Sequence, residues 1–166
     1  MLIVLAGLPG SGKTTVAREI VARLPAVYLR IDSIEQALVS AKVLAGEVGP
    51  AGYVVAYEVA RSNLALGLTV VVDCVNPLPV TREAWRAVAT STPSRVLEVE
   101  IVCSDAAEHR RRVAHRKADI PGHVLPDWAS VLRHDYEPWA TDRLVIDTAV
   151  VSAGDAAQQI VAQARA

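Results

Sequence analysis

The sequence predicts an α/β fold in which a five-stranded parallel sheet is covered by helices on both faces. Apolar, β-branched runs alternate with segments of helical periodicity along the whole chain. Three of these runs are almost continuously apolar, as is typical of parallel strands buried on both faces. A chain of 166 residues, 52% hydrophobic and 21% charged, suffices for one full core and is short for two. We therefore expect a single domain over residues 1–166.

Five runs rich in Val, Leu and Ile are expected to form the strands. They are Leu2–Ala6, Ala26–Ile31, Thr69–Val75, Val96–Cys103 and Arg143–Asp147. The fourth run places Glu98 and Glu100 on one side of the strand. This alternation predicts a strand near an edge of the sheet or under a polar helix.

Six segments with helical periodicity separate or follow these strands. They are Lys13–Leu24, Ser33–Ala45, Tyr53–Leu66, Thr81–Ala89, Asp105–His115 and Ala153–Ala164. The capping-box spacings of Ser33 with Gln36 and of Asp105 with Glu108 predict two of the helix starts.

The loop after the first strand has the sequence GLPGSGKT and matches the pattern G-x-x-x-x-G-K-[ST]. Its glycines let successive backbone N–H groups turn toward one anion, and the following helix adds its positive dipole end. Lys13 would reach the β- and γ-phosphates of a nucleotide, and the Thr14 hydroxyl would bind Mg²⁺. The expected phosphate-binding residues are Gly7, Leu8, Pro9, Gly10, Ser11, Gly12, Lys13, Thr14 and Thr15.

Aspartates follow two further strands, where the sheet would place them beside this loop. Asp73 ends the third strand and is a candidate second Mg²⁺ ligand, with a helix cap or turn former as the alternative. Asp32 ends the second strand and would accept a proton from an attacking hydroxyl, unless it serves only as an N-cap. Glu35, one turn later, is expected to be an exposed helix carboxylate.

The segment EHRRRVAHR carries arginines on the helix after the fourth strand. Arg112 and Arg116 are four residues apart and are expected to share one helix face, where they would stack on an adenine ring and stabilise the transferring phosphate. Arg110 and Arg111 are expected to be solvated. We expect His109 and His115 at the surface rather than as metal ligands, because no His and Cys cluster has ligand spacing.

A lid is expected over approximately residues 105–127. After the arginine helix the chain reads KADIPGHVLPDW, which is rich in Pro and Gly and lacks periodicity. Such a segment would close over the nucleotide and exclude water. Trp128, Tyr136 and Trp139 follow it; core packing is the default expectation for each, and an acceptor pocket is the alternative.

Charge and cysteine usage restrict the class of protein. The 17 basic and 18 acidic residues give a net charge of −1, which provides no global attraction to nucleic acid or to anionic membrane. Cys74 and Cys103 each lie inside an apolar run and are expected to be buried thiols, which fits a reducing compartment. The opening run MLIVLAG lacks the basic leading segment and the length of a secretory signal. We therefore expect a cytoplasmic protein; its oligomeric state has no readable signature.

With these motifs the chain resembles the small P-loop kinases of the nucleoside-monophosphate-kinase-like class, and more closely those that include adenylylsulfate kinase, chloramphenicol phosphotransferase, gluconate kinase and polynucleotide kinase. The similarity covers GLPGSGKT, the aspartate after the second strand, VVVD, the arginine-rich helix and the late VIDT. It implies a three-layer fold with sheet order 2-3-1-4-5, Asp32 as the catalytic base, and residues Thr148 to Val151 near the adenine. Polynucleotide kinases of this class usually carry arginine where this chain has Glu35.

The motifs together predict an ATP- and Mg²⁺-dependent kinase that phosphorylates a hydroxyl of a small molecule. Lys13, Asp32 and Arg116 are the expected catalytic residues. A 5′-hydroxyl polynucleotide kinase is one alternative, although the near-neutral charge and Glu35 argue against it. A nucleotide-dependent regulatory ATPase without a phosphate acceptor is the other.

Overall fold

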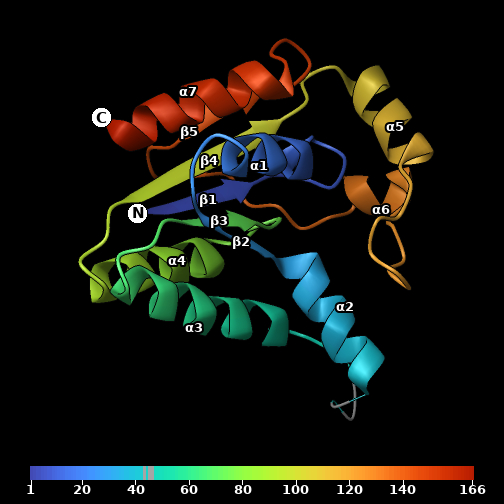
Figure 1. Cartoon of the computed structure of the whole chain (residues 1–166). Helices are drawn as coiled ribbons and strands as arrows, with labels where there is room; N and C mark the ends of the chain where they lie inside the picture. The colour runs from blue at the N-terminus through green and yellow to red at the C-terminus, as the bar shows by residue number, and fades with distance from the viewer. Residues whose placement is uncertain (43, 45–46) are drawn as a thin grey trace.

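The computed structural model of the chain describes residues 1–42, 44 and 47–166. Its centre is the predicted five-stranded sheet (Figure 1), in which every pairing is parallel. The strands are β1 (Leu2–Ala6), β2 (Val27–Arg30), β3 (Val70–Asp73), β4 (Val96–Val102) and β5 (Leu144–Asp147). They are ordered β2-β3-β1-β4-β5 across the sheet, so the order implied by the resemblance is confirmed.

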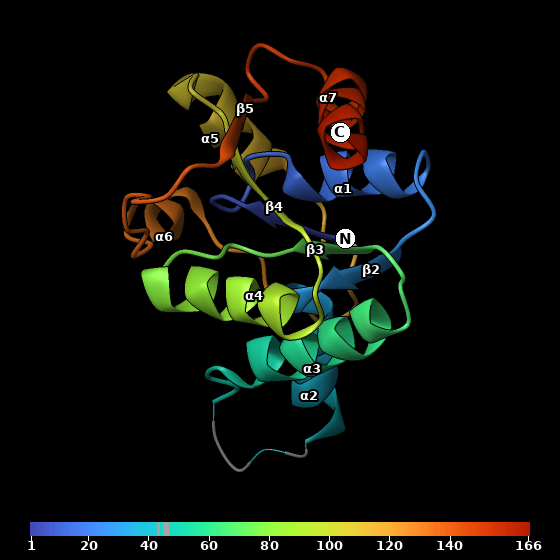
Figure 2. The ribbon, with the colours of Figure 1, turned by 90° about the vertical axis from the view of Figure 1, so that its left-hand side faces the viewer.

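Helices cover both faces of the sheet, as predicted. Figure 2 shows α1 (Lys13–Val21) and α7 (Ala153–Arg165) on one face, and α3 (Ala51–Ala65) and α4 (Pro79–Ser91) on the other. The remaining helices lie toward the carboxyl ends of the strands (Figure 1). They are α2 (Ile31–Ala41), α5 (Ala106–His115) and α6 (Trp128–Leu132).

The alternation of side chains along β1 builds two hydrophobic cores. Ile3 and Leu5 belong to the cluster packed against α1 and α7, whereas Leu2 and Val4 belong to the cluster packed against α3 and α4. All four side chains are fully buried, because successive residues of a strand point to opposite faces and both faces are covered. Trp85 of α4 is the largest fully buried side chain of the second cluster.

The start of α2 differs from the prediction. Strand β2 ends at Arg30 and α2 begins at Ile31 with no loop between them. Arg30 is therefore the N-cap, and the predicted capping box of Ser33 with Gln36 is wrong; Gln36 instead bonds Ser40. Asp32 consequently lies in the first turn of the helix. Helix α2 ends at Ala41, and the predicted end at residue 45 lies outside the described residues.

The other predicted cap forms. The carboxylate of Asp105 accepts hydrogen bonds from the backbone N–H groups of Ala107 and Glu108, at 2.9 and 3.0 Å. Helix α6 was not expected, because five residues are too few to show a helical period. It begins after Asp127, whose side chain accepts a hydrogen bond from the Ser130 N–H at 2.7 Å.

The two glutamates of β4 are buried and paired. Strand β4 lies beside the edge strand β5, and Arg86 of α4 donates two hydrogen bonds to Glu98, each of 3.1 Å. Glu100 accepts hydrogen bonds from Tyr136 at 3.1 Å and from Arg143 at 2.8 Å. The alternation in this run therefore marks a strand that lies both next to the edge and under charged side chains.

The aromatic side chains after α6 pack around Arg82 of α4. This guanidinium, whose residue is only 2% exposed, donates hydrogen bonds of 2.7–3.1 Å to four backbone carbonyls. They belong to Asn76, Pro77, Glu137 and Pro138. The rings of Tyr136 and Trp139 lie 5.2 and 4.2 Å from the guanidinium carbon. Tyr136 and Trp139 thus fix this segment to the loop after β3, and neither lines the large cleft described below.

Candidate functional site

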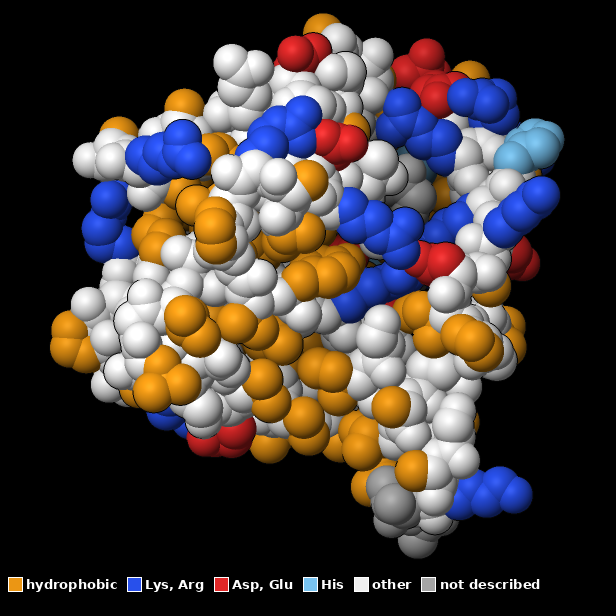
Figure 3. All heavy atoms as spheres, in the orientation of Figure 1, with side chains coloured by type: hydrophobic (Ala, Val, Ile, Leu, Met, Phe, Trp, Pro, Cys, Tyr) orange, Lys and Arg blue, Asp and Glu red, His pale blue; other side chains and the backbone are white. Residues whose placement is uncertain are grey.

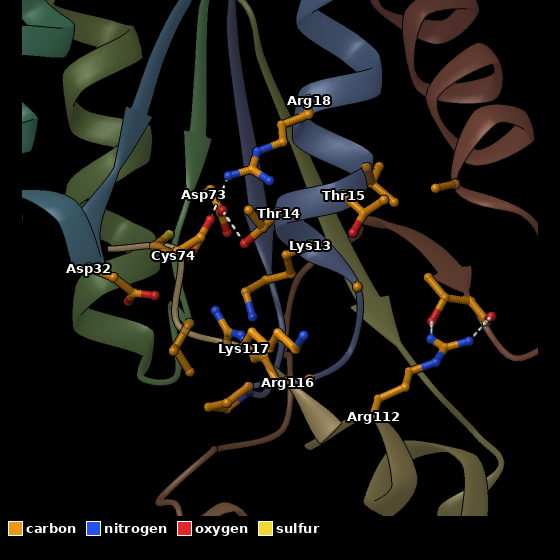
Figure 4. A pocket seen from close by; sticks show the side chains of 18 of the residues that line it. Lys13, Thr14, Thr15, Arg18, Asp32, Asp73, Cys74, Arg112, Arg116 and Lys117 are labelled. Carbon is orange, nitrogen blue, oxygen red and sulfur yellow. Dashed lines mark hydrogen bonds and ion pairs between the residues drawn. The ribbon is translucent and has the colours of Figure 1, made fainter. Parts of the chain in front are cut away.

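A cleft of about 670 Å³ opens at the carboxyl ends of the strands. Most of the predicted site residues line it, although they come from five separate stretches of the chain. They are Pro9, Gly10, Gly12, Lys13, Thr14, Thr15, Asp32, Asp73, Arg112, Arg116 and Thr148. In the close view of Figure 4, Asp32 and Arg112 lie on opposite sides with Lys13 between them. The position of the site at this edge of the sheet agrees with the prediction.

Three residues of the phosphate loop do not line this cleft. Gly7, Leu8 and Ser11 border a smaller cavity of about 230 Å³ on the β4 side of the loop. Gly7 has a φ of 141°, and a Cβ atom there would lie only 2.1 Å from the carbonyl oxygen of Ile101. Only glycine fits this position, so the first glycine of the motif sets the path of the loop against β4.

Lys13 is buried at the centre of the cleft. The residue is 8% exposed, and its Nζ donates a hydrogen bond of 3.0 Å to the carbonyl oxygen of Leu8. Burial lowers the pKa of Lys13, while the nearby carboxylates of Asp73 and Asp32 act in the opposite direction. The ammonium is thus fixed by its own loop and lies within the field of the two candidate site aspartates.

Thr14 and Asp73 form the candidate metal site. The Thr14 hydroxyl donates to Asp73 Oδ2 at 2.7 Å, and the Tyr28 hydroxyl donates to the same oxygen at 2.9 Å. Burial, followed by the charge of Asp73, raises the pKa of Tyr28 well above its usual range, so Tyr28 remains a donor.

These oxygens fit magnesium. Mg²⁺ prefers oxygen ligands and usually takes one or two from the protein and the rest from phosphate and water. Among the residues that the structure describes, no group of three or more His, Cys, Asp or Glu side chains could hold a metal ion. Thr14 and Asp73 would therefore hold the ion together with the nucleotide phosphates.

Asp32 lines the cleft from the first turn of α2. Its side chain is 31% exposed, and its Oδ2 lies 3.5 Å from Nη2 of Arg30. The expectation that Glu35 is exposed is wrong, because Glu35 is half-buried against α3. A Cβ atom on Gly52 would lie 2.3 Å from its Cγ. Burial, with a smaller contribution from Asp32, raises the pKa of Glu35 to about 7.

The two arginines of the α5 segment diverge. Helix α5 ends at His115 and Arg116 is extended, so the expectation that Arg112 and Arg116 share one helix face is wrong. Arg112 donates to the hydroxyl and the carbonyl oxygen of Thr148 at 2.8 and 3.0 Å, and to Glu108 at 2.7 Å. Arg116 lies near enough to Lys13 to lower the pKa of that ammonium. Arg112 thus reaches the loop after β5, and Arg116 reaches the phosphate loop (Figure 4).

His109 supports the phosphate loop from behind. We expected a surface position, but the residue is only 7% exposed. Its Nε2 lies 2.8 Å from the carbonyl oxygen of Pro9, and its ring packs edge-on against Trp128. His109 is buried because α5 packs directly on the phosphate loop. A Cβ atom on Gly10 would lie only 2.5 Å from the Val113 side chain of α5. His115 is exposed, as predicted.

The predicted lid segment contacts the core through Asp119. Its Oδ2 accepts hydrogen bonds from Arg18 of α1 at 2.5 Å and from Arg30 of β2 at 2.8 Å. These bonds hold the pKa of Asp119 well below its usual range, and the bond from Arg30 has the largest effect. The sequence analysis missed Arg18, Arg30 and Asp119, because contacts spanning about 100 residues leave no local pattern.

The predicted thiols differ in burial. Cys74 is buried beside Asp73, and burial raises the pKa of its thiol well above the usual range. Cys103 is only partly buried, because β4 ends one residue before it. In the described part of the chain no helix has the length and apolar character needed to cross a membrane.

Comparison with known proteins places the chain in a family. The family model described as AAA domain matches residues 2–134. The chain belongs to this family. No curated protein matches the sequence. The fold is that of the small P-loop kinases, so the predicted resemblance is confirmed.

Three solved structures illustrate the similarity. A protein from Chloroflexus aurantiacus has a TM-score of 0.76 at 19% identity, over 99% of this chain and 95% of that one. Kti12 of Chaetomium thermophilum, in complex with ADP-AlF3, has a TM-score of 0.74 at 18% identity, over 98% and 96% of the two chains. The APS kinase CysC of Mycobacterium tuberculosis, in complex with AMPPNP and APS, has a TM-score of 0.65 at 19% identity, over 99% and 97%. At these identities the likeness is one of fold.

Proposed function

We propose that this AAA domain protein is an ATP- and Mg²⁺-dependent phosphotransferase that moves the γ-phosphate of ATP to a hydroxyl of a small molecule. The observation that carries the proposal is the composition of the cleft. One cavity contains the phosphate loop with Lys13, the oxygen pair of Thr14 and Asp73, and the separate carboxylate of Asp32. A site that only bound nucleotide would have no use for the last of these.

The donor half of the cleft would hold ATP. The loop N–H groups and the amino end of α1 bind the phosphates, and Lys13 exchanges its bond to the Leu8 carbonyl for the β- and γ-phosphate oxygens. Magnesium, held by Thr14 and Asp73, would neutralise charge on those oxygens. Thr148 lies beside Gly12, since a Cβ atom there would be 3.3 Å from the Thr148 methyl group. We expect the nucleoside to lie at this end of the site, next to the loop after β5.

The acceptor half would carry out the transfer. Asp32 accepts the proton of the acceptor hydroxyl while the hydroxyl oxygen forms a bond to the γ-phosphorus. The bond from that phosphorus to the β,γ-bridging oxygen breaks, and ADP leaves with the electron pair. Arg116, close to Lys13, stabilises the negative charge of the transferring group.

A small acceptor is favoured over a polynucleotide end. The chain has a net charge of −1, and Glu35 occupies the turn after Asp32. A nucleic-acid groove would need basic side chains along its path, because phosphate neutralisation supplies most of such binding.

A regulatory ATPase is the second candidate. Kti12 is among the similar structures and is not described as a kinase. This alternative predicts slow release of phosphate to water and no transfer to any added compound.

An acceptor screen with radiolabelled ATP tests the proposal. Purified protein is incubated with Mg²⁺, labelled ATP and a library of alcohols, sugars, nucleosides and 5′-hydroxyl oligonucleotides, beside a control without acceptor. We expect label on at least one small hydroxyl compound at a rate well above that of the control. Label recovered only as inorganic phosphate across the library would refute the kinase and favour the regulatory ATPase.

A further inference from the structure

Two arginines converge on a single carboxylate oxygen beside the proposed catalytic base. Oδ2 of Asp119 accepts hydrogen bonds from Arg18 Nη2 at 2.5 Å and from Arg30 Nη1 at 2.8 Å. Arg18 projects from α1 into the cleft (Figure 4), Arg30 ends β2, and Asp119 comes from the lid segment. The consecutive elements α1 and β2 thus build one binding position for an oxygen anion, which a residue of the distant lid segment fills.

This position lies next to Asp32. The side chain of Arg30 is 5% exposed, and its Nη2 lies 3.5 Å from Asp32 Oδ2. Its Nε lies 3.9 Å from Asp73 Oδ2. The guanidinium that holds Asp119 therefore also contacts the proposed base and approaches the candidate metal ligand. If the anionic group of a ligand replaced the Asp119 carboxylate, the neighbouring atoms of that ligand would lie beside Asp32.

The charges of the cleft favour an anion at this position. Five basic side chains line the cleft against three acidic ones. Arg112 is occupied by Thr148 and Glu108, and Lys13 and Arg116 belong to the phosphate loop side. Arg18 and Lys117 remain, and of these two Arg18 bonds Asp119 on the acceptor side. In Figure 3, basic and acidic side chains lie interleaved on the face between α1 and α2, in contrast to the hydrophobic surface below.

The neighbouring carboxylates do not oppose this assignment. Glu35 is half-buried, and burial raises its pKa to about 7. Near neutral pH it therefore carries only part of a negative charge. Asp73 would be paired with Mg²⁺ once the ion is bound, which leaves Asp32 as the carboxylate that faces the acceptor.

We propose that Arg18 and Arg30 bind an anionic group of the acceptor, a carboxylate or a phosphate, and that Asp119 occupies this position until the acceptor displaces it. The inference rests on the proposed function and names its substrate class: a small molecule with one hydroxyl to be phosphorylated and one anionic group. The exchange would release the lid segment from Arg18 and Arg30. Gly122 of the lid rests on α2, since a Cβ atom there would lie 3.0 Å from the Gln36 side chain.

Matched pairs of acceptors test the proposal. Phosphorylation is measured with Mg²⁺ and ATP for glycerate and glycerol, for gluconate and sorbitol, and for glycerol 3-phosphate and glycerol. We expect kcat/KM to be at least about tenfold higher for the anionic member of a pair, since a hydrogen bond to a charged partner has that effect or more. The first two pairs test carboxylate and the third tests phosphate.

Variants connect the preference to these arginines. Arg18→Gln and Arg30→Gln should each remove most of the preference, mainly through KM. Arg110→Gln, an exposed arginine of α5 outside the cleft, is the matched control and should keep the preference. Arg18 is largely exposed, so its variant will fold even if removal of the buried Arg30 prevents folding. Asp119→Asn should lower KM for the anionic acceptors, because it removes the internal competitor.

The outcomes separate the two proposals. Equal kcat/KM for charged and neutral members, or a preference unchanged in Arg18→Gln, overturns the anion site and leaves the kinase standing. A raised KM in Asp119→Asn for both members overturns the exchange, because Asp119 would then serve only to hold the lid. If nothing is phosphorylated, the kinase proposal fails. Thermal unfolding with Mg²⁺ and ADP then tests the anion site. If gluconate or glycerol 3-phosphate raises the unfolding temperature of the wild type but not of Arg18→Gln, the anion site is supported. If neither compound raises it, the anion site is overturned.

Discussion

Replacing Lys13 by methionine should strongly reduce kcat/KM for phosphate transfer without lowering the free energy of unfolding. A lysine needed only for structure would show the opposite result. Methionine keeps the length of the side chain and removes the charge. In the protein the Lys13 ammonium is almost fully buried and makes one hydrogen bond, to the Leu8 carbonyl.

The magnitudes follow from that environment. Burial lowers the pKa of Lys13, which means that the fold disfavours its charged form. Loss of one hydrogen bond costs about 1–2 kcal/mol, and relief of the buried charge offsets it, so we expect a free energy of unfolding equal to the wild type or up to about 2 kcal/mol higher. Loss of two charge-assisted bonds to phosphate oxygens would cost about 3–6 kcal/mol in the transition state, or roughly 10²–10⁴-fold in kcat/KM.

Urea unfolding and steady-state kinetics measure the two quantities on the same preparation. Lys117→Met is the matched control, because Lys117 also lines the cleft but is exposed. We expect it to change kcat/KM by less than about tenfold. A Lys13→Met protein that unfolds at lower urea and retains most of its turnover would refute the reasoning.

Three further perturbations test other parts of the site. Asp32→Asn should leave ATP binding, measured by calorimetry, within about twofold and lower kcat by roughly 10²–10⁴-fold, as expected for a general base; unchanged kcat would exclude that role. Gly7→Ala should lower the free energy of unfolding, measured with urea, by at least about 2 kcal/mol, because its Cβ would lie 2.1 Å from the Ile101 carbonyl oxygen at a φ of 141°. Gly67→Ala is the control: Gly67 also has a positive φ, but no atom lies within 4 Å of its Cβ position, so the loss should be smaller. The pKa of Glu35 is raised to about 7, so wild-type stability should fall as pH rises between about 4.5 and 7. Because Glu35 is only half-buried, solvent screening limits the loss to about 1–2 kcal/mol. Glu35→Gln should flatten this part of the profile, and an unchanged slope would contradict the burial of a proton on Glu35.

The sequence sufficed for the sheet and for the donor side of the cleft. Runs such as VVVD are apolar at every position, a pattern that requires cover on both faces, and the structure has helices on both. Lys13, Thr14 and Asp73 share the cleft because the ends of adjacent parallel strands must meet. These inferences depend only on local pattern and on topology.

The errors about His109, Glu35 and the lid contact have a common physical cause, which is contact between segments that are separate in the sequence. His109 reads as one polar residue in a charged helix, yet α5 packs that face on the phosphate loop a hundred residues earlier in the chain. The sequence around Glu35 predicts an exposed side chain, but in the fold Gly52 of α3 packs against it. The bond between Arg30 and Asp119 joins β2 to the lid, and neither residue lies in a motif. Charges of this kind are predictable only once the fold is known.

The direct passage of β2 into α2 has a consequence for the evolution and redesign of the site. Arg30, Asp32 and Glu35 lie within six residues on one stiff strand–helix junction, so they move as a body and keep their mutual spacing. In the proposed enzyme these acceptor-side residues would therefore lie in one short segment, with no loop between the strand and the helix. Exchange of residues 30–36 for the same segment of a relative should change Arg30, Asp32 and Glu35 together, while Arg18 of α1 and the donor half stay in place.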